Sequence, residues 1–246
     1  MIGQMSITVL ALLLAAAPHH ATPADGESIV RTMRERGAAH SYQSLSFVQT
    51  TTFPDRPSET WYESLQAPGL LRIDVAPLGS RTMLFRNDSI YGFRDGKPGR
   101  KGPYVHPLMV LLTDVYVLPA ERTIARLKAL GFDLSRSHDE TWNGEAVHVV
   151  GALAGDTVSS QFWIDRSELG LVRMIEKSTN GERMESQVTK RVRFGKALVE
   201  TEMHFLVNGK EIQREVYTQV TVNPKFDAGI FDPEKNVTPT WISAVR

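Results

Sequence analysis

The sequence contains no cysteine and no excess of either charge, with 28 Lys and Arg against 28 Asp and Glu. Without cysteine, the chain cannot form disulfide bonds, zinc sites with thiolate ligands, thiol nucleophiles or a lipid-modified N-terminal cysteine. A net charge of zero provides no long-range field that would steer the protein onto nucleic acid or an anionic membrane surface. We therefore expect no nucleic-acid partner.

Long apolar runs are also missing, apart from a short one near the N-terminus. Residues 7–17 are mostly apolar, and Pro18, two histidines and small residues up to Ala24 follow them. A membrane-spanning helix needs about 20 apolar residues, whereas a shorter run suits the core of a signal peptide. No Lys or Arg precedes the run, so a buried first helix is the alternative. We predict a signal peptide over 1–24, export, and one mature domain over 25–246.

Sequence motifs of catalytic and metal sites are absent as well. The chain has no HExxH, no GxSxG, no phosphate-binding loop and no dinucleotide fingerprint. The histidines are scattered, and the one local cluster, residues 138–140, lies where neighbouring side chains of a strand face opposite sides. We therefore predict that the protein is not an enzyme and that it has no metal site and no cofactor.

Most of the chain alternates between apolar and polar residues, as β-strands do. A short helix begins at Asp25 and ends near Gly37. The alternation then continues to residue 222, interrupted by turns that include three Asn-Gly pairs. This pattern predicts a mainly β (α+β) fold, with about ten strands in one antiparallel meander. Because a sheet of that length leaves its edges exposed, we expect it to curl or to close.

The last three strands assign residues to the two faces of the sheet. Met203 and Phe205 fall on the apolar face of one strand, and Ile212 and Val216 on that of the next. The solvated face is assigned Arg183, Glu185, Arg191, Arg193, Glu200, Glu202, Glu211, Gln213 and Glu215. Charges of both signs at cross-strand spacing indicate solvated pairs there.

A helical insertion interrupts the strands near the middle of the chain. Residues 95–103 combine Gly, Pro and basic residues, which predicts a flexible loop. Residues 107–117 are strongly apolar, and 119–130 show helical spacing up to Gly131. We expect these few helices to cover the apolar face of the sheet.

Large aromatic residues and methionines are assigned to the apolar face and to the insertion. They form either a plainly packed core or an adaptable cavity for an acyl chain. The candidate ligand-binding residues are Phe47, Trp61, Ile73, Met83, Phe85, Leu108, Leu111, Leu112, Phe162, Ile164, Met174, Met203 and Phe205.

Three parts of the chain carry a resemblance to a known family. They are residues 44–49 (SLSFVQ), residues 155–165 with 171–175, and residues 217–224 with 230–233. They resemble the start, the paired central strands and the ending of the LolA-like carriers, which are periplasmic proteins related to lipoprotein sorting.

The resemblance implies a half-open β-barrel whose apolar concave side is closed by a helical lid, formed here by 107–117 and 119–130. It also implies a soluble periplasmic protein that binds acyl chains of a lipid or lipoprotein, with an inner-membrane exporter or an outer-membrane acceptor as partner. In the lipoprotein carrier an arginine of the barrel holds the lid shut. Residues 43–53 contain no arginine, so no gating residue is transferred and another lipid cargo is open. The alternative function is a non-enzymatic module that senses lipids or envelope stress and signals to a membrane partner.

Overall fold

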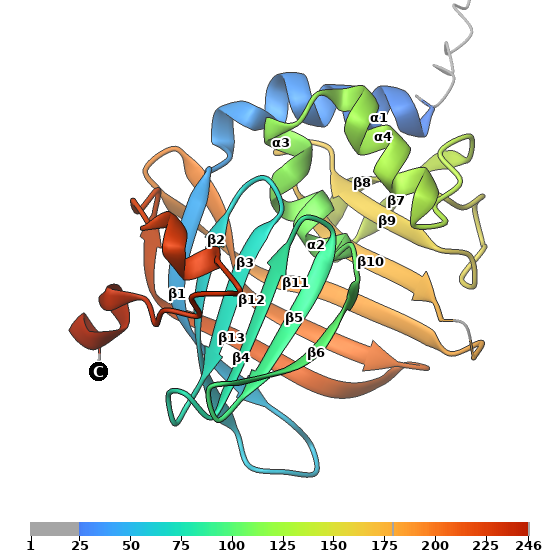
Figure 1. Ribbon diagram of the computed structural model, residues 1–246. Helices are drawn as coiled ribbons and strands as arrows, with labels where there is room; N and C mark the ends of the chain where they lie inside the picture. Colours follow the sequence, from blue (N-terminus) through green and yellow to red (C-terminus); the bar gives the residue numbers. More distant parts are fainter. Residues whose placement is uncertain (1–24, 179, 246) are drawn as a thin grey trace, which may run out of the picture.

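A computed structural model describes residues 25–178 and 180–245, so the predicted signal peptide over 1–24 lies outside the described residues. The described chain forms one antiparallel sheet of 13 strands that curls round, with helices across one end (Figure 1). The sheet does not close into a barrel, because β6 and β7 are its two unpaired edges. The prediction of a mainly β fold with one curled antiparallel sheet is confirmed.

The first and last strands lie side by side in the sheet. β1 (Ser44–Thr52) pairs with β13 (Lys210–Val222) on one side and with β2 (Glu59–Gln66) on the other. The first arm of the sheet is β1 to β6 and continues after β2 with β3 (Leu70–Val75), β4 (Arg81–Arg86), β5 (Ser89–Arg94) and β6 (Lys97–Pro103). The second arm continues from β13 through β12 (Ala197–Val207), β11 (Arg183–Phe194), β10 (Leu171–Lys177), β9 (Gln161–Asp165), β8 (Glu145–Val150) and β7 (Ser137–Trp142).

The first helix, α1 (Gly26–Arg36), begins where the sequence predicts it. Asp25 is the N-cap, and its carboxylate accepts a hydrogen bond of 2.8 Å from the backbone N–H of Ser28. This satisfies one of the N–H groups that a helix leaves without a partner in its first turn. A 3-10 turn, η1 (Gly37–His40), then leads into β1.

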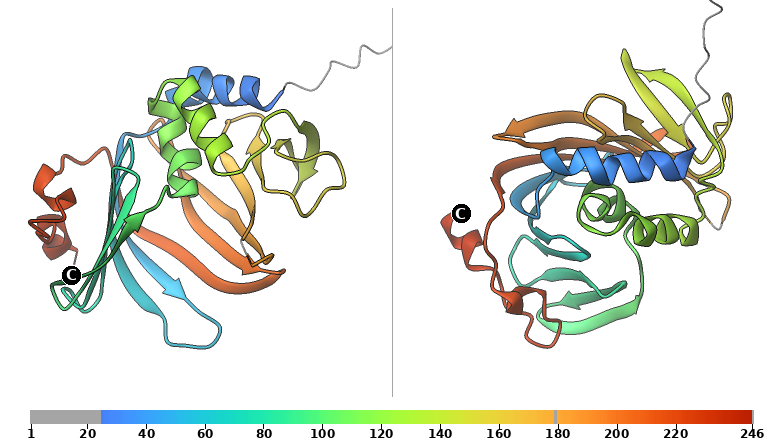
Figure 2. Two further views of the ribbon diagram at one scale, coloured as in Figure 1. Left: turned by 45° about the vertical axis from the view of Figure 1, so that its right-hand side comes forward. Right: turned by 90° about the horizontal axis from the view of Figure 1, so that it is seen from above.

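The helical insertion forms the rest of the cover. It consists of α2 (Pro107–Met109), a π-helical turn η2 (Val110–Asp114), α3 (Val115–Val117) and α4 (Ala120–Ala129). Together with α1 these elements make the helical cap, which lies across one end of the curled sheet (Figures 1 and 2). The predictions of helices over 107–117 and 119–130 are confirmed.

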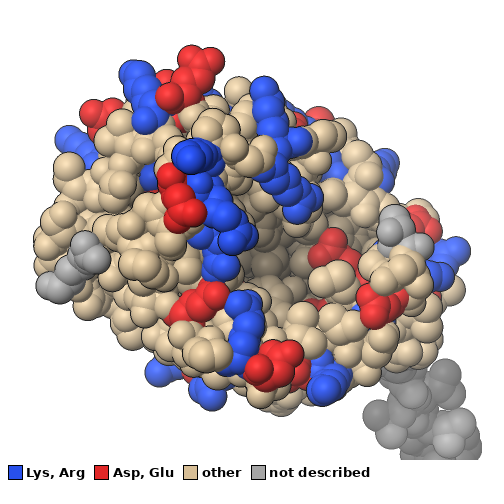
Figure 3. Space-filling view, turned by 60° about the horizontal axis from the view of Figure 1, so that its bottom comes forward, with Lys and Arg blue, Asp and Glu red and all other residues tan. Residues whose placement is uncertain are grey.

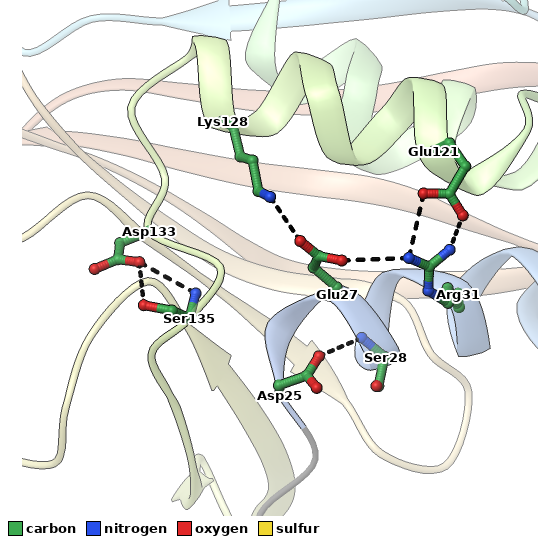
Figure 4. Close-up of polar contacts among 8 residues, drawn as sticks. All are labelled: Asp25, Glu27, Ser28, Arg31, Glu121, Lys128, Asp133 and Ser135. Atoms are coloured by element: carbon green, nitrogen blue, oxygen red, sulfur yellow. Dashed lines mark hydrogen bonds and ion pairs between the residues drawn. The ribbon is translucent and has the colours of Figure 1, made fainter.

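Ion pairs join α1 to α4 on the outside of the cap (Figure 4). Lys128 Nζ lies 2.6 Å from the carboxylate of Glu27, and Arg31 pairs with Glu27 at 3.2 Å and also with Glu121. Exposed pairs of this kind contribute about 0–1 kcal/mol each. Apolar packing beneath the cap therefore holds it in place.

That packing fills the space between the cap and the second arm of the sheet. Ile29 of α1 and Leu127 of α4 are buried there with Phe132 and Phe162. The rings of Phe132 and Phe162 meet edge to face, with centroids 5.3 Å apart. This is the main core, and it leaves the concave face of the first arm to the cavity described below.

The C-terminal segment after β13 covers the convex face of the first arm (Figure 2). It contains η3 (Ala228–Phe231) and η4 (Thr240–Ala244). Arg72 is only 1% exposed, pairs with Asp74 at 2.6 Å and donates a hydrogen bond of 3.1 Å to the carbonyl of Ile230. Trp241 donates one of 2.8 Å to the hydroxyl of Ser64. Both faces of β2 and β3 are therefore buried.

Residues 97–103, which the sequence predicts as part of a flexible loop, form strand β6 instead. The strand pairs with β5 along the edge of the sheet. Proline and glycine are tolerated on an edge strand, because only one side of the strand needs hydrogen bonds. The sheet has 13 strands, so the expected number of about ten was too low, and β6 is one of the strands that it left out.

Candidate functional site

A cavity of about 300 Å³ lies on the concave side of the sheet. Its walls come from strands β1 to β4, β12 and β13 and from the underside of the cap at α2 and η2. The face of the molecule turned away from the helices is hollowed, with Lys and Arg gathered along part of the rim (Figure 3). The volume is at the lower end of the range of about 300–1,000 Å³ for small-molecule sites.

The structure divides the candidate residues into two groups. The cavity is lined by Phe47, Trp61, Ile73, Met83, Phe85, Leu108, Leu112, Met203 and Phe205. The main core beneath the cap instead contains Leu111, Phe162, Ile164 and Met174. Alternation along a strand selects the concave face but does not show how far the cap covers it, so sequence reasoning could not separate the two groups.

Acidic side chains also line the cavity, which contradicts part of the face assignment. Glu200 of β12 and Gln213 and Glu215 of β13 were predicted on the solvated face, but all three line the cavity. Ile212, predicted on the apolar face, is 39% exposed. The pairing of β13 with β1 shifts between Thr218 and Thr221, and the pairing of β12 with β11 shifts between Glu200 and Glu202. Such bulges put the apolar and polar positions out of phase.

Glu63 of β2 is a cavity residue that sequence reasoning missed. It follows Trp61 and precedes Leu65 at intervals of two, and all three line the cavity. This spacing on a strand places side chains on the same face, so the signal was present in the sequence. Glu63 is 7% exposed as a residue, and no described residue donates a hydrogen bond to its carboxyl group.

Glu215, in contrast, has donors next to it. Its carboxylate accepts hydrogen bonds of 2.6 Å from the Gln213 amide and 2.8 Å from the Tyr217 hydroxyl. The ring of Tyr217 stacks on Phe47, with centroids 4.3 Å apart, which fixes the hydroxyl toward Glu215. Burial raises the pKa of Glu215. Burial and the neighbouring charge of Glu215 also raise the pKa of Glu63 well above its usual value.

Glu200 and His106 complete the polar part of the wall. Glu200 accepts a hydrogen bond of 3.3 Å from Tyr42, and burial raises its pKa to about 7. The ring of His106 packs against Phe85 with centroids 5.2 Å apart, and burial lowers its pKa to about 4. His106 is therefore neutral near pH 7. None of the described residues that line the cavity is Lys or Arg.

The histidine-containing cluster at 138–140 lies elsewhere, on the edge strand β7. His138 contacts Glu140 at 3.2 Å, and Asp139 contacts His148 of β8 at 2.7 Å. Within residues 25–178 and 180–245, no group of three or more His, Cys, Asp or Glu is placed to hold a metal ion. The same ranges include no helix of the length and apolarity that crossing a membrane requires.

Solved structures of similar fold cover most of the chain. One is a domain from Vibrio parahaemolyticus that is named for outer membrane lipoprotein sorting; it has a TM-score of 0.58 at 10% identity and covers 85% of this chain and 98% of its own. A LolA superfamily protein from Nitrosomonas europaea has a TM-score of 0.52 at 11% identity, with 85% and 97% covered. The chain has a LolA-like fold.

A DUF1329 family protein from Desulfovibrio piger is also similar in fold to this chain, with a TM-score of 0.55 at 11% identity over 84% of this chain and 95% of its own. Sequence comparison alone finds no matching family model and no similar curated protein. At these identities the similarity concerns the fold, and the function has to be argued from the cavity.

Proposed function

We propose that the protein is a periplasmic carrier that binds acyl chains of a lipid or lipoprotein in this cavity and carries them across the cell envelope. The observation that supports it best is the cavity itself, because the cap leaves open a space that is lined by aromatic and methionine side chains of the concave face. Trp61, Met83, Phe85 and Phe205 come from three strands and surround this space. Flexible methionines and large rings adapt to an irregular apolar guest.

Burial of hydrocarbon provides the affinity that a carrier needs. Each methylene removed from water contributes about 0.8 kcal/mol. Roughly ten buried methylenes therefore provide about 8 kcal/mol, which corresponds to a micromolar dissociation constant before ordering costs are subtracted. The lid would be the helical cap, which would have to separate from the apolar packing beneath it in order to open. An exporter in the inner membrane or an acceptor in the outer membrane would be the exchange partner.

Native mass spectrometry of the protein, expressed with its own N-terminal segment and purified from the periplasmic fraction, tests the proposal. We expect an acyl ligand to co-purify, and we expect Phe205→Asp to reduce its occupancy at least about tenfold, because a charge in the wall opposes hydrocarbon burial. Ile212→Asp is the matched control, since Ile212 lies on the adjacent strand and is 39% exposed.

Two results would contradict the carrier. An empty protein that also fails to take up a fluorescent fatty acid would leave the cavity without an acyl ligand. Retention of the ligand in the presence of acceptor vesicles would favour the sensing module, because a carrier has to release its cargo to a membrane.

A further inference from the structure

The carboxyl groups of the cavity have no cationic partner in its wall. Glu63 of β2 is only 7% exposed and lines the cavity. Its carboxyl group accepts no hydrogen bond from any described residue. Glu215 of β13 lies close enough for its charge to act on Glu63. A buried polar group without a partner costs free energy comparable to its desolvation, so such a group in a cavity wall is a candidate for contact with a ligand.

The other polar groups of the wall show which ligands fit. Glu200 supplies a third carboxyl group, and the hydroxyl of Tyr217 is already donated to Glu215. His106 carries no charge near pH 7, because burial lowers its pKa to about 4. An anionic head group, such as a carboxylate or a phosphate, would therefore find no cation among the described residues of the wall, and its charge would oppose ionisation of the three carboxyl groups.

An ammonium group has the opposite properties. It presents three N–H donors and a positive charge, whereas a carboxylate presents only acceptors. Hydrogen bonds between such ions are about twice as strong as those between neutral groups, and a water-poor cavity strengthens them further. A cation beside Glu63 and Glu215 also favours their ionised forms, which offsets the burial that raises the pKa of both.

We propose that the cavity selects amphiphiles with an amine head group; this inference rests on the proposed binding of acyl chains. The ammonium lies against Glu63 and Glu215, and the hydrocarbon lies along the apolar wall that includes Met83, Phe85 and Phe205. Amphiphiles with an anionic head group bind more weakly, because the described wall offers them no cation.

Isothermal titration with three ligands of equal chain length tests the selection. Dodecylamine, dodecanol and dodecanoate carry a cationic, a neutral and an anionic head group at neutral pH. We expect dodecylamine to bind the purified full chain at least about tenfold more tightly than dodecanoate, a difference of about 1.4 kcal/mol. Equal affinities, or tighter binding of dodecanoate, would overturn the selection while leaving the carrier intact. Failure of all three to bind would overturn both.

Variants assign the selection to the two carboxyl groups. In Glu63→Gln and in Glu215→Gln, we expect the preference for dodecylamine over dodecanoate to fall to within about threefold. Dodecanol binding should stay unchanged, which shows that each variant is folded with an intact apolar wall. Glu202→Gln is the matched control, because Glu202 pairs with Arg214 outside the cavity. An unchanged preference in both cavity variants would overturn the assignment.

Discussion

Glu200 couples the protonation of the cavity to the stability of the fold. Its side chain accepts a hydrogen bond from Tyr42, and burial raises its pKa from 4.5 to about 7. Between these two pH values the folded protein holds a proton that the unfolded chain has lost. Raising the pH through this range therefore favours unfolding. The stabilising contribution of Glu200 is fully present below about pH 4.5 and is lost as the pH approaches 7.

Glu200→Gln should remove this pH dependence. We expect the free energy of unfolding of the variant, relative to the unmodified protein, to increase by up to about 3 kcal/mol between about pH 4.5 and pH 8, because a pKa unit corresponds to about 1.4 kcal/mol. Urea titrations at the two pH values measure the difference. His106, whose lowered pKa acts in the opposite direction, affects both proteins equally. A difference that stays constant with pH would contradict the burial of an ionisable Glu200.

Individual cavity residues were predictable where the strand is regular and not where it bulges. Trp61 was identified from its position on the apolar face, and Glu63 could have been, because it lies two residues further on the same strand. Glu215 was assigned to the wrong face, since the pairing of β13 with β1 shifts between Thr218 and Thr221, beyond Glu215 on the same strand. A bulge leaves no local signal in the alternation, so the sequence cannot show it.

Helix α1 is an element whose stability depends on one cap. Asp25→Ala should lower the free energy of unfolding by about 1 kcal/mol, because the N–H of Ser28 loses its acceptor. Thermal or urea denaturation measures the change. Asp25→Asn is the control and should remain close to the unmodified protein, since asparagine caps helices about as well. Equal losses in both variants would show that the charge of Asp25 matters more than its hydrogen bond.

The edge strand β6 depends on residues that discourage further pairing. It carries Pro98 and Lys101, of which Lys101 also lies over the ring of Tyr91. Replacing both by valine should make the edge a template for a second chain, because proline and lysine are residues that protect exposed edges. We expect concentration-dependent self-association by analytical ultracentrifugation. Thr50→Val on β1 is the control, because Thr50 is exposed but pairs with Thr60 on one side and Val216 on the other; this variant should remain monomeric to the same extent as the unmodified protein.

Elements were predicted well where hydrophobic periodicity is strong. The cap helices and most strands follow it, and two of the Asn-Gly turns, at Asn143 and Asn208, adopt the positive φ values that this pair favours. β6 was missed, because its Gly, Pro and Lys residues lack periodicity and its pairing with β5 depends on the backbone alone. The position of such a strand is set by its pairing with the neighbouring strand, so its own composition does not predict it.

For the whole molecule, the C-terminal segment acts as a cover for the first arm. Removing residues 226–246 should lower the free energy of unfolding by at least about 4 kcal/mol, because Ile230, Phe231 and Ile242 are buried and each such side chain contributes about 1.5–3 kcal/mol. Urea titration measures the loss. Val237→Ala is the control within the same segment and should have little effect, since Val237 is half exposed.

The opening of the sheet was the least predictable feature of the molecule. A simple meander would have its free edges at the first and last strands, but here these two pair and the edges are β6 and β7. The gap between the two free edges therefore lies where the helical insertion connects β6 to β7, and the cap spans the two arms there. Local alternation carries no information about pairing between β1 and β13, which are separated by most of the chain.

The pairing of β1 with β13 has a consequence for the order in which the sheet can form. β1 to β6 can form hairpins from residues 44–103 alone, yet the free side of β1 has no partner until β13, beginning at Lys210, is also present. A chain that emerges N-terminus first, from a ribosome or from an export channel, therefore holds an unpaired edge and an apolar concave face until residue 210 follows. Pairing between strands so far apart in the sequence is slow and leaves the chain open to aggregation in that interval. A holding chaperone should therefore bind the chain between the completion of β6 and the arrival of β13.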